Sequence, residues 1–194
     1  MYHRLLRSAS FWTFLFSVDE ELAEAARKAG CQCGGPLHCA NYPRNPRGGC
    51  ENLPESYRRR LSFCCGRDGC RKRSTPQSVR FLGRKVFLGA VVVLVAAMRQ
   101  GPSPRRVREL TELFGADRRT IARWCTFWRE QFPETPFWKV ARGRFVPRLA
   151  IADLPRALLE AFIQRKDSRD DWKRLLRFLS PITITGGLGI TGIS

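Results

Sequence analysis

Apolar residues recur with helical spacing at both ends of the chain, and this spacing is lost in between. Residues 1–30 predict a leading segment that ends in a helix, with Ser17 or Asp19 as the N-cap. Gly30 is expected to end that helix. Residues 31–80 are instead rich in the Gly, Pro and Asn of turns, so they cannot form a conventional helical core.

The helical pattern resumes in the second half of the chain. Residues 84–100 predict a mostly apolar helix. Ser103 then caps a second helix that Gly115 ends, and Asp117 caps a third helix. Prolines within residues 133–136 are expected to close this block.

The remaining residues predict a connector and further helices. Residues 137–150 are expected to be strand-bearing or irregular, and they contain Arg142, Arg144 and Arg148. A helix or helix pair is expected over residues 155–179. The predicted units are therefore an N-terminal helical segment, a cysteine-rich module, a helical domain, a C-terminal connector with helices, and a poorly ordered tail, over residues 1–30, 31–80, 81–136, 137–180 and 181–194.

Two apolar runs resemble targeting or membrane segments at first sight. Residues 11–16 are too short for the core of a signal peptide, and an acidic triplet follows them. Residues 86–98 fall short of the roughly 20 apolar residues that a membrane-spanning helix needs. We therefore expect both runs to be buried helix faces and the protein to be cytoplasmic, where cysteines stay reduced.

Seven of the eight cysteines lie between Cys31 and Cys70. They include two close pairs, Cys31 with Cys33 and Cys65 with Cys70, separated by a long loop. Two thiol pairs on turns are how a zinc ribbon presents a tetrahedral set of ligands. The sequence therefore predicts a structural Zn²⁺ site, which would stabilise a segment that has little core of its own.

The third ligand is ambiguous because Cys64 adjoins Cys65. In a strand over residues 60–64 and onward, Leu61 and Phe63 share a face with Cys65, whereas Cys64 points the other way. We therefore favour Cys65 and keep Cys64 as the alternative. Other possible ligands or bystanders in the loop are His38, Cys39 and Cys50. The competing interpretation is a set of reduced cysteines without metal.

The chain carries 35 Lys and Arg against 17 Asp and Glu, a net charge of +18. Such a surplus opposes a compact fold unless a polyanion neutralises it, and Arg, the commoner cation here, suits phosphate and guanine. This charge favours nucleic acid as the partner over an anionic membrane surface. Between Ser56 and Lys85 the only acid is Asp68, against ten cations at 58, 59, 60, 67, 71, 72, 73, 80, 84 and 85. This run is expected to contact phosphates, and within it Arg71, Lys72 and Arg73 directly follow Cys70, which would hold them in place.

Residues 104–131 have the elements of a helix-turn-helix, with Gly115 in the turn. Its second helix begins with the residues that would reach base edges in the major groove, namely Arg118, Arg119, Thr120 and Arg123. The alternative is an ordinary helical hairpin with solvated arginines.

These features together resemble a known family. A cysteine ribbon, the Arg71–Arg73 run, an apolar helix and a helix-turn-helix ending in Arg123 and Trp124 look like the zinc-ribbon and helix-turn-helix region of bacterial insertion-sequence proteins. These are transposase N-terminal regions and their accessory proteins. The resemblance covers residues 31–131, although the cysteine spacings depart from the usual ribbon. It implies binding to terminal-repeat DNA in transposition, with metal ligands Cys31, Cys33, Cys65 and Cys70 and base-reading residues Arg118, Arg119 and Arg123.

The catalytic part of a transposase is not recognisable, because a two-metal nuclease needs three convergent carboxylates on a strand-rich scaffold. After residue 131 the acids fall mostly on expected helices and turns. We therefore expect a non-enzyme, mainly α with a small β zinc ribbon followed by a helix-turn-helix domain, that binds DNA as an accessory or regulatory protein. The alternatives are an RNA-binding zinc protein and a module that docks a transposase or polymerase. A homodimer through the helices after Pro155 is a further expectation.

Overall fold

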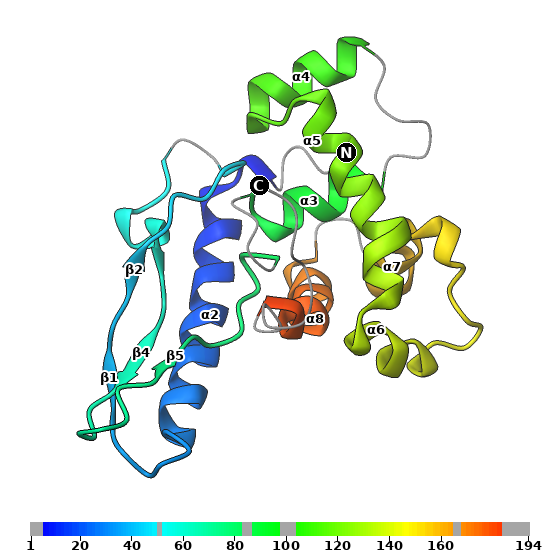
Figure 1. The fold of residues 1–194 in the computed structure, drawn as a ribbon. Helices are drawn as coiled ribbons and strands as arrows, with labels where there is room; N and C mark the ends of the chain where they lie inside the picture. Colours follow the sequence, from blue (N-terminus) through cyan, green and yellow to red (C-terminus); the bar gives the residue numbers. More distant parts are fainter. Residues whose placement is uncertain (1–5, 50–51, 83–86, 98–103, 165–167, 184–194) are drawn as a thin grey trace.

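A long N-terminal helix and a small sheet occupy one side of the molecule, and shorter helices occupy the other (Figure 1). The computed structural model describes residues 6–49, 52–82, 87–97, 104–164 and 168–183. The expectation of a mainly helical chain with a small antiparallel sheet is confirmed. The terminal residues 184–194, expected to be poorly ordered, lie outside the described residues.

Helix α2 spans Ala9–Ala29 and begins earlier than the sequence suggested. Its N-cap is Ser8, so the predicted caps at Ser17 and Asp19 are wrong. The cause is that the preceding apolar run is itself helical and buries Phe11, Trp12 and Leu15. Gly30 ends the helix with a φ of 73°, as predicted.

Short strands follow α2. Strands β1 (Leu37–Cys39), β4 (Phe63–Cys65) and β5 (Arg73–Ser74) form an antiparallel sheet in the order β1-β4-β5. Strands β2 (Tyr42–Pro43) and β3 (Arg59–Arg60) form a second antiparallel pair, and a 3₁₀ turn over Glu55–Arg58 precedes β3. In the larger sheet Leu37 of β1 pairs with Cys65 of β4. The turn with Cys31 and Cys33, which precedes β1, therefore lies near Cys65.

Helix α3 spans Gly89–Ala96, and every one of its residues is buried. It is shorter than the helix predicted over residues 84–100. Phe87 and Leu88 precede it in isolated β-bridges to Arg47 and Phe81, so the helix begins only at Gly89. The remainder of that prediction falls on residues 84–86 and 98–100, which lie outside the described residues.

Helices α4 (Pro104–Phe114) and α5 (Arg118–Thr126) follow as predicted. The predicted cap Ser103 lies outside the described residues. The chain continues beyond α5 through a π-helical turn over Phe127–Gln131 and a 3₁₀ turn over Phe132–Glu134. Pro136 then begins helix α6 (Pro136–Ala141), because the Thr135 side chain caps it.

The connector predicted over residues 137–150 is therefore helical at its start. A 3₁₀ turn over Arg142–Arg144 follows α6, and another over Ile151–Asp153 precedes α7. The predicted helix pair is confirmed as α7 (Arg156–Phe162) and α8 (Arg169–Leu179), with a 3₁₀ turn over Ser180–Thr183 after it.

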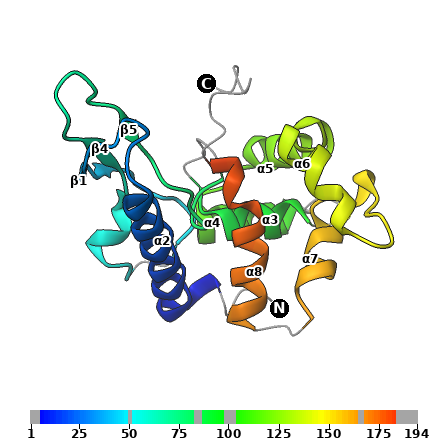
Figure 2. The ribbon, with the colours of Figure 1, turned by 90° about the horizontal axis from the view of Figure 1, so that it is seen from below.

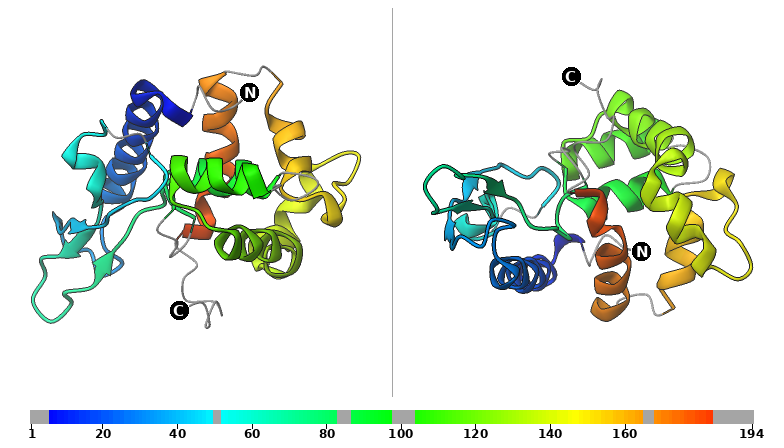
Figure 3. Two further views of the ribbon diagram at one scale, coloured as in Figure 1. Left: turned by 90° about the horizontal axis from the view of Figure 1, so that it is seen from above. Right: turned by 60° about the horizontal axis from the view of Figure 1, so that its bottom comes forward.

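One large core joins these helices. Figures 2 and 3 show α8 lying between α2 and α7, with α3 crossing nearby. Phe11 of α2 packs edge-on against Trp172 of α8, with 6.0 Å between the ring centroids. Leu175, Leu176 and Leu179 are also buried inside this chain. This face of α8 therefore packs within the chain, and the homodimer expected from the helices after Pro155 stays a prediction.

No helix among the described residues is both long enough and apolar enough to cross a lipid bilayer. The two apolar runs examined in the sequence contribute to the large core where they are described. Residues of both, such as Trp12 and Val92, are fully buried.

Candidate metal centre and nucleic-acid interface

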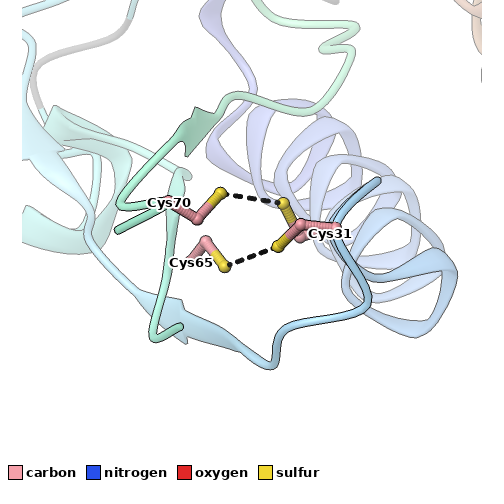
Figure 4. A group of neighbouring side chains, drawn as sticks. Cys31, Cys65 and Cys70 are labelled. Atoms are coloured by element: carbon pink, nitrogen blue, oxygen red, sulfur yellow. Dashed lines mark hydrogen bonds between the residues drawn. The ribbon is translucent and has the colours of Figure 1, made fainter. Parts of the chain in front are cut away.

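Four cysteine thiols converge where α2 meets the sheet. The sulfur atoms of Cys31, Cys33, Cys65 and Cys70 all lie within 4.8 Å of one another. The Sγ atoms of Cys31 and Cys70 are 3.8 Å apart, and those of Cys33 and Cys65 are 3.5 Å apart (Figure 4). These separations exceed the roughly 2.05 Å of a disulfide bond. The four side chains thus form a group that can hold a metal ion.

Tight turns position the first pair of thiols. The backbone N–H of Gly34 donates to the carbonyl of Cys31 at 2.8 Å, and Gly34 has a φ of 78°. Gly35 lies so close to the cluster that a Cβ there would be 2.6 Å from the Cys65 sulfur and 3.3 Å from the Cys33 sulfur. A glycine is therefore needed at position 35 for the thiols to approach one another.

The second pair lies at the end of β4 and in the turn after it. The Cys65 N–H donates to the carbonyl of Lys72 at 2.9 Å, and the Cys70 N–H donates to that of Arg67 at 3.1 Å. Gly69, in this turn, has a φ of 80°. The resulting loop folds back over the strand and brings the two thiols to the same side of the sheet.

The pKa values of the thiols differ across the cluster. The pKa of Cys33 is lowered to about 6, first by a backbone hydrogen bond from Gly35 and then by the neighbouring thiols. A backbone hydrogen bond from Arg67 lowers the pKa of Cys65, but burial and the neighbouring thiols outweigh it and raise that pKa to about 12. The Cys33 thiol therefore loses its proton readily, whereas Cys65 keeps its proton, because a second thiolate would be repelled by the first. A bound divalent cation would remove this repulsion.

Cys64 points away from the cluster. Its sulfur lies 3.4 Å from the carbonyl of Arg71, whereas the adjacent Cys65 is fully buried among the other thiols. This difference follows from strand alternation, which also buries Phe63 on the Cys65 side. Of the other candidates, His38 and Cys39 are exposed, and Cys50 lies outside the described residues.

The basic run divides into exposed and buried residues. Arg71, Lys72 and Arg73 are exposed beside the thiol cluster, as the phosphate-contact prediction requires. Further exposed cations in the run are Arg58, Arg59 and Arg67. Arg60 and Arg80, however, are 3% and 0% exposed, so their inclusion among the phosphate contacts is wrong. Residues 84 and 85 lie outside the described residues.

Arg80 forms a buried ion pair with Asp19. Its Nε donates to the carboxylate of Asp19 at 2.7 Å, and both side chains are fully buried. The same carboxylate accepts from the Ser78 hydroxyl and the Val79 N–H, each at 2.6 Å. Asp19 lies four residues after buried Leu15 and on the same face of α2, so helical spacing alone indicates that Asp19 is buried. The sequence analysis missed this signal.

The turn between α4 and α5 has the features expected of a helix-turn-helix. Gly115 ends α4 with a φ of 64°, and its N–H donates to the carbonyl of Thr111 at 2.8 Å. The Asp117 carboxylate caps α5 by accepting from the N–H of Thr120 at 2.7 Å. That hydrogen bond is also the main reason why the pKa of Asp117 is lowered.

An apolar face fixes α5 against the core. Ile121 and Trp124 are buried, and the Trp124 ring meets Phe87 edge-on with 4.9 Å between centroids. The exposed residues of α5 include no acid; they are Arg118, Arg119, Ala122, Arg123 and Thr126. The structure therefore gives this element one buried apolar side and one positively charged side.

The predicted DNA-contacting residues of α5 are not all equivalent. Arg118, Arg119 and Arg123 are exposed. Thr120 is only 7% exposed, and its hydroxyl accepts a hydrogen bond from the Arg123 guanidinium at 3.0 Å. Thr120 is thus placed to orient Arg123, whereas the three arginines are open to a ligand.

Comparison with known proteins identifies no relative: no family model, curated protein or solved structure matches this chain.

Proposed function

We propose that this protein is a DNA-binding accessory or regulatory protein of mobile-element type. The observation that carries the proposal is the acid-free arginine side of α5, formed by Arg118, Arg119 and Arg123 and held on a rigid apolar base. Arginine pairs with guanine edges, and the first turns of a recognition helix are where such contacts are made. The mobile-element context rests on the resemblance described above.

The thiol cluster would hold a structural zinc ion. Four thiolates at the usual Zn–S distance of 2.3 Å define a tetrahedron with edges of about 3.8 Å, close to the 3.5 and 3.8 Å found for the two sulfur pairs. An all-cysteine set leaves no open coordination position, so the ion would stabilise the fold and not take part in catalysis. We also propose that the protein is not an enzyme, because its acids after residue 131, in the part of the chain that the structure describes, fall on helices and turns and not on the strand-rich scaffold that a two-metal nuclease needs.

The ion would also orient a second DNA contact. Arg71, Lys72 and Arg73 begin one residue after Cys70, so a metal bound there fixes their backbone. The Arg73 guanidinium lies 5.5 Å from the centre of the Tyr42 ring. Contacts from such residues to phosphates would add affinity and salt dependence without sequence preference.

Selection from a random duplex library, followed by binding measurements on the selected sequence, tests the proposal. Arg119→Ala/Arg123→Ala is expected to abolish sequence-specific binding while leaving the zinc content unchanged. The matched control is Arg169→Ala/Arg177→Ala, which removes the same charge from α8. Equal losses in both variants, or a wild-type preference for RNA over duplex DNA, would contradict the proposal.

A further inference from the structure

The exposed large hydrophobic side chains of the described residues all belong to one short segment. Val140, Val146 and Ile151 are 78%, 94% and 44% exposed. Exposed large apolar side chains that gather in one place mark an interaction surface. Val146 and Ile151 lie in residues 142–151, which follow α6 and which we call the distal loop, and Val140 lies in the last turn of α6 just before it.

The distal loop also concentrates positive charge. Arg142, Arg144 and Arg148 are exposed, and none of them makes an ion pair in the part of the chain that the structure describes. The chain has no acid between Glu134 and Asp153, and Glu134 pairs instead with Lys139 at 2.8 Å. These arginines and exposed apolar groups together favour an anionic partner that also has apolar surface.

The base of the distal loop is anchored in the core. The Phe145 ring packs against Phe162 and Phe178, with centroid distances of 6.0 and 5.6 Å. Leu149 is partly buried against the same core. The residues between these two anchors, 146–148, are exposed, so they form a tip on a fixed support.

The arrangement of the molecule relates this loop to α5. In Figures 1, 2 and 3 the larger sheet and the distal loop, drawn in yellow, lie at opposite edges of the molecule, with α4 and α5 between them. The π-helical turn after α5, a 3₁₀ turn and α6 lead directly from α5 to the distal loop, so both belong to one continuous helical part of the chain.

We infer that the distal loop binds the minor groove of the same duplex that α5 contacts. Arginine side chains are attracted to the enhanced negative potential of a narrow, A·T-rich minor groove. Apolar side chains beside them, here Val146 and Pro147, press against or between base steps in minor-groove proteins. This inference rests on the proposed function, and it adds a second, differently specific contact on the DNA.

Binding of the full chain to two fluorescein-labelled 30-bp duplexes, one A·T-rich and one G·C-rich, tests the inference by anisotropy between 50 and 200 mM KCl. Arg142→Ala/Arg144→Ala/Arg148→Ala is expected to remove the A·T preference. It should also reduce the slope of log K against log salt by about 2.7, since each phosphate neutralised contributes about 0.9. The triple Lys variant at the same positions should keep most of the slope but lose the A·T preference.

Competition with netropsin, which occupies the A·T minor groove, uses only wild-type protein and so does not depend on how the variants fold. Netropsin should lower the affinity of the wild-type protein for the A·T-rich duplex about as much as the triple Ala change does. Wild-type binding to neither duplex would overturn the proposed function and the inference with it. Unchanged affinity, slope and netropsin sensitivity in the triple Ala variant would overturn the inference alone. Loss of binding to phosphatidylserine vesicles in the triple Ala variant, with its DNA binding intact, would also overturn the inference, because the distal loop would then contact a membrane surface and not DNA.

Discussion

At the scale of single residues, the Asp19–Arg80 pair connects the N-terminal helix to the segment that follows the sheet. Besides the ion pair, the Arg80 guanidinium donates to the carbonyls of Tyr57 and Arg59 at 2.8 and 3.0 Å. It also lies 4.7 Å from the centre of the Phe16 ring. Almost every polar atom of the pair is therefore satisfied, as a buried charge requires.

Asp19→Ala is expected to lower the free energy of unfolding by about 3–5 kcal/mol, because it leaves the Arg80 charge buried without its partner. Urea unfolding monitored by tryptophan fluorescence measures the change. Asp19→Ala/Arg80→Met should recover a large part of the loss, since an apolar side chain replaces the unpaired charge. A single variant as stable as wild type would show that the pair is not buried as described.

The unequal thiol pKa values predict an order of reaction. In a short iodoacetamide pulse given directly after chelation, before the metal-free segment unfolds, Cys33 should be alkylated before Cys65 at pH 7, because a thiol with a pKa of about 6 is mostly thiolate and one with a pKa of about 12 is not. Lowering the pH from 7 to 5 should slow the Cys33 reaction, since protonation below pKa 6 removes the thiolate. Peptide mass mapping identifies the modified residue. Faster modification of Cys65 would contradict the assigned environments.

At the scale of elements, the sequence was most informative where turn residues and periodicity agreed. Gly115 and Asp117 marked the limits of α4 and α5 correctly, because a glycine with positive φ and a capping carboxylate act locally. The start of α2 was misplaced at Ser17 or Asp19 because the 11–16 run, expected to be a buried helix face, belongs to the same continuous helix as the residues after it. Strand alternation favoured Cys65 over Cys64 as the inward thiol, and the structure places Cys65 in the cluster.

What could not be predicted depends on long-range contacts. The burial of Arg60 and Arg80 follows from partners in distant parts of the chain, which a count of charges does not show. The helical start of the 137–150 connector differs from the prediction, because Pro136 begins a helix and does not end one. With Thr135 as the cap, it is instead a favourable first residue.

The close approach of Gly35 to the thiols gives an element-level prediction. Gly35→Ala should weaken metal affinity about 10–100-fold, the usual range for changes next to metal ligands, because the added Cβ would collide with the Cys65 sulfur. Gly143→Ala is the matched control, since a Cβ there meets nothing within 4 Å. The rate of zinc transfer to a chromogenic chelator compares the two. Equal affinities in both variants would exclude close packing of position 35 on the cluster.

At the scale of the whole molecule, the described residues form two apolar clusters of very different size. The large one joins α2, α3, α5 and α8, whereas the small one contains little beyond Ala23, Leu37, Phe63 and the cysteines. A cluster that small cannot offset the conformational entropy of its segment. Tyr57 belongs to the large core, so the thiol site is the main device for holding the three-stranded sheet and its turns, within residues 31–39 and 61–74.

Removal of metal should consequently unfold only part of the molecule. After treatment with a strong chelator, hydrogen exchange at the amides of Cys65, Gly66 and Cys70 should accelerate toward unprotected rates. The amides of Val92 and Trp172 should stay protected, because the large core does not include the thiols. Simultaneous loss of protection in both regions would show that the two clusters are one cooperative unit.

The most direct test of the account is the metal content of freshly purified, reduced protein, measured by native mass spectrometry together with elemental analysis. We predict one zinc ion per chain, retained by Cys64→Ser and lost in Cys65→Ser. A metal content near zero in the wild-type protein would contradict the central claim, as would a site that depends on Cys64 and not on Cys65.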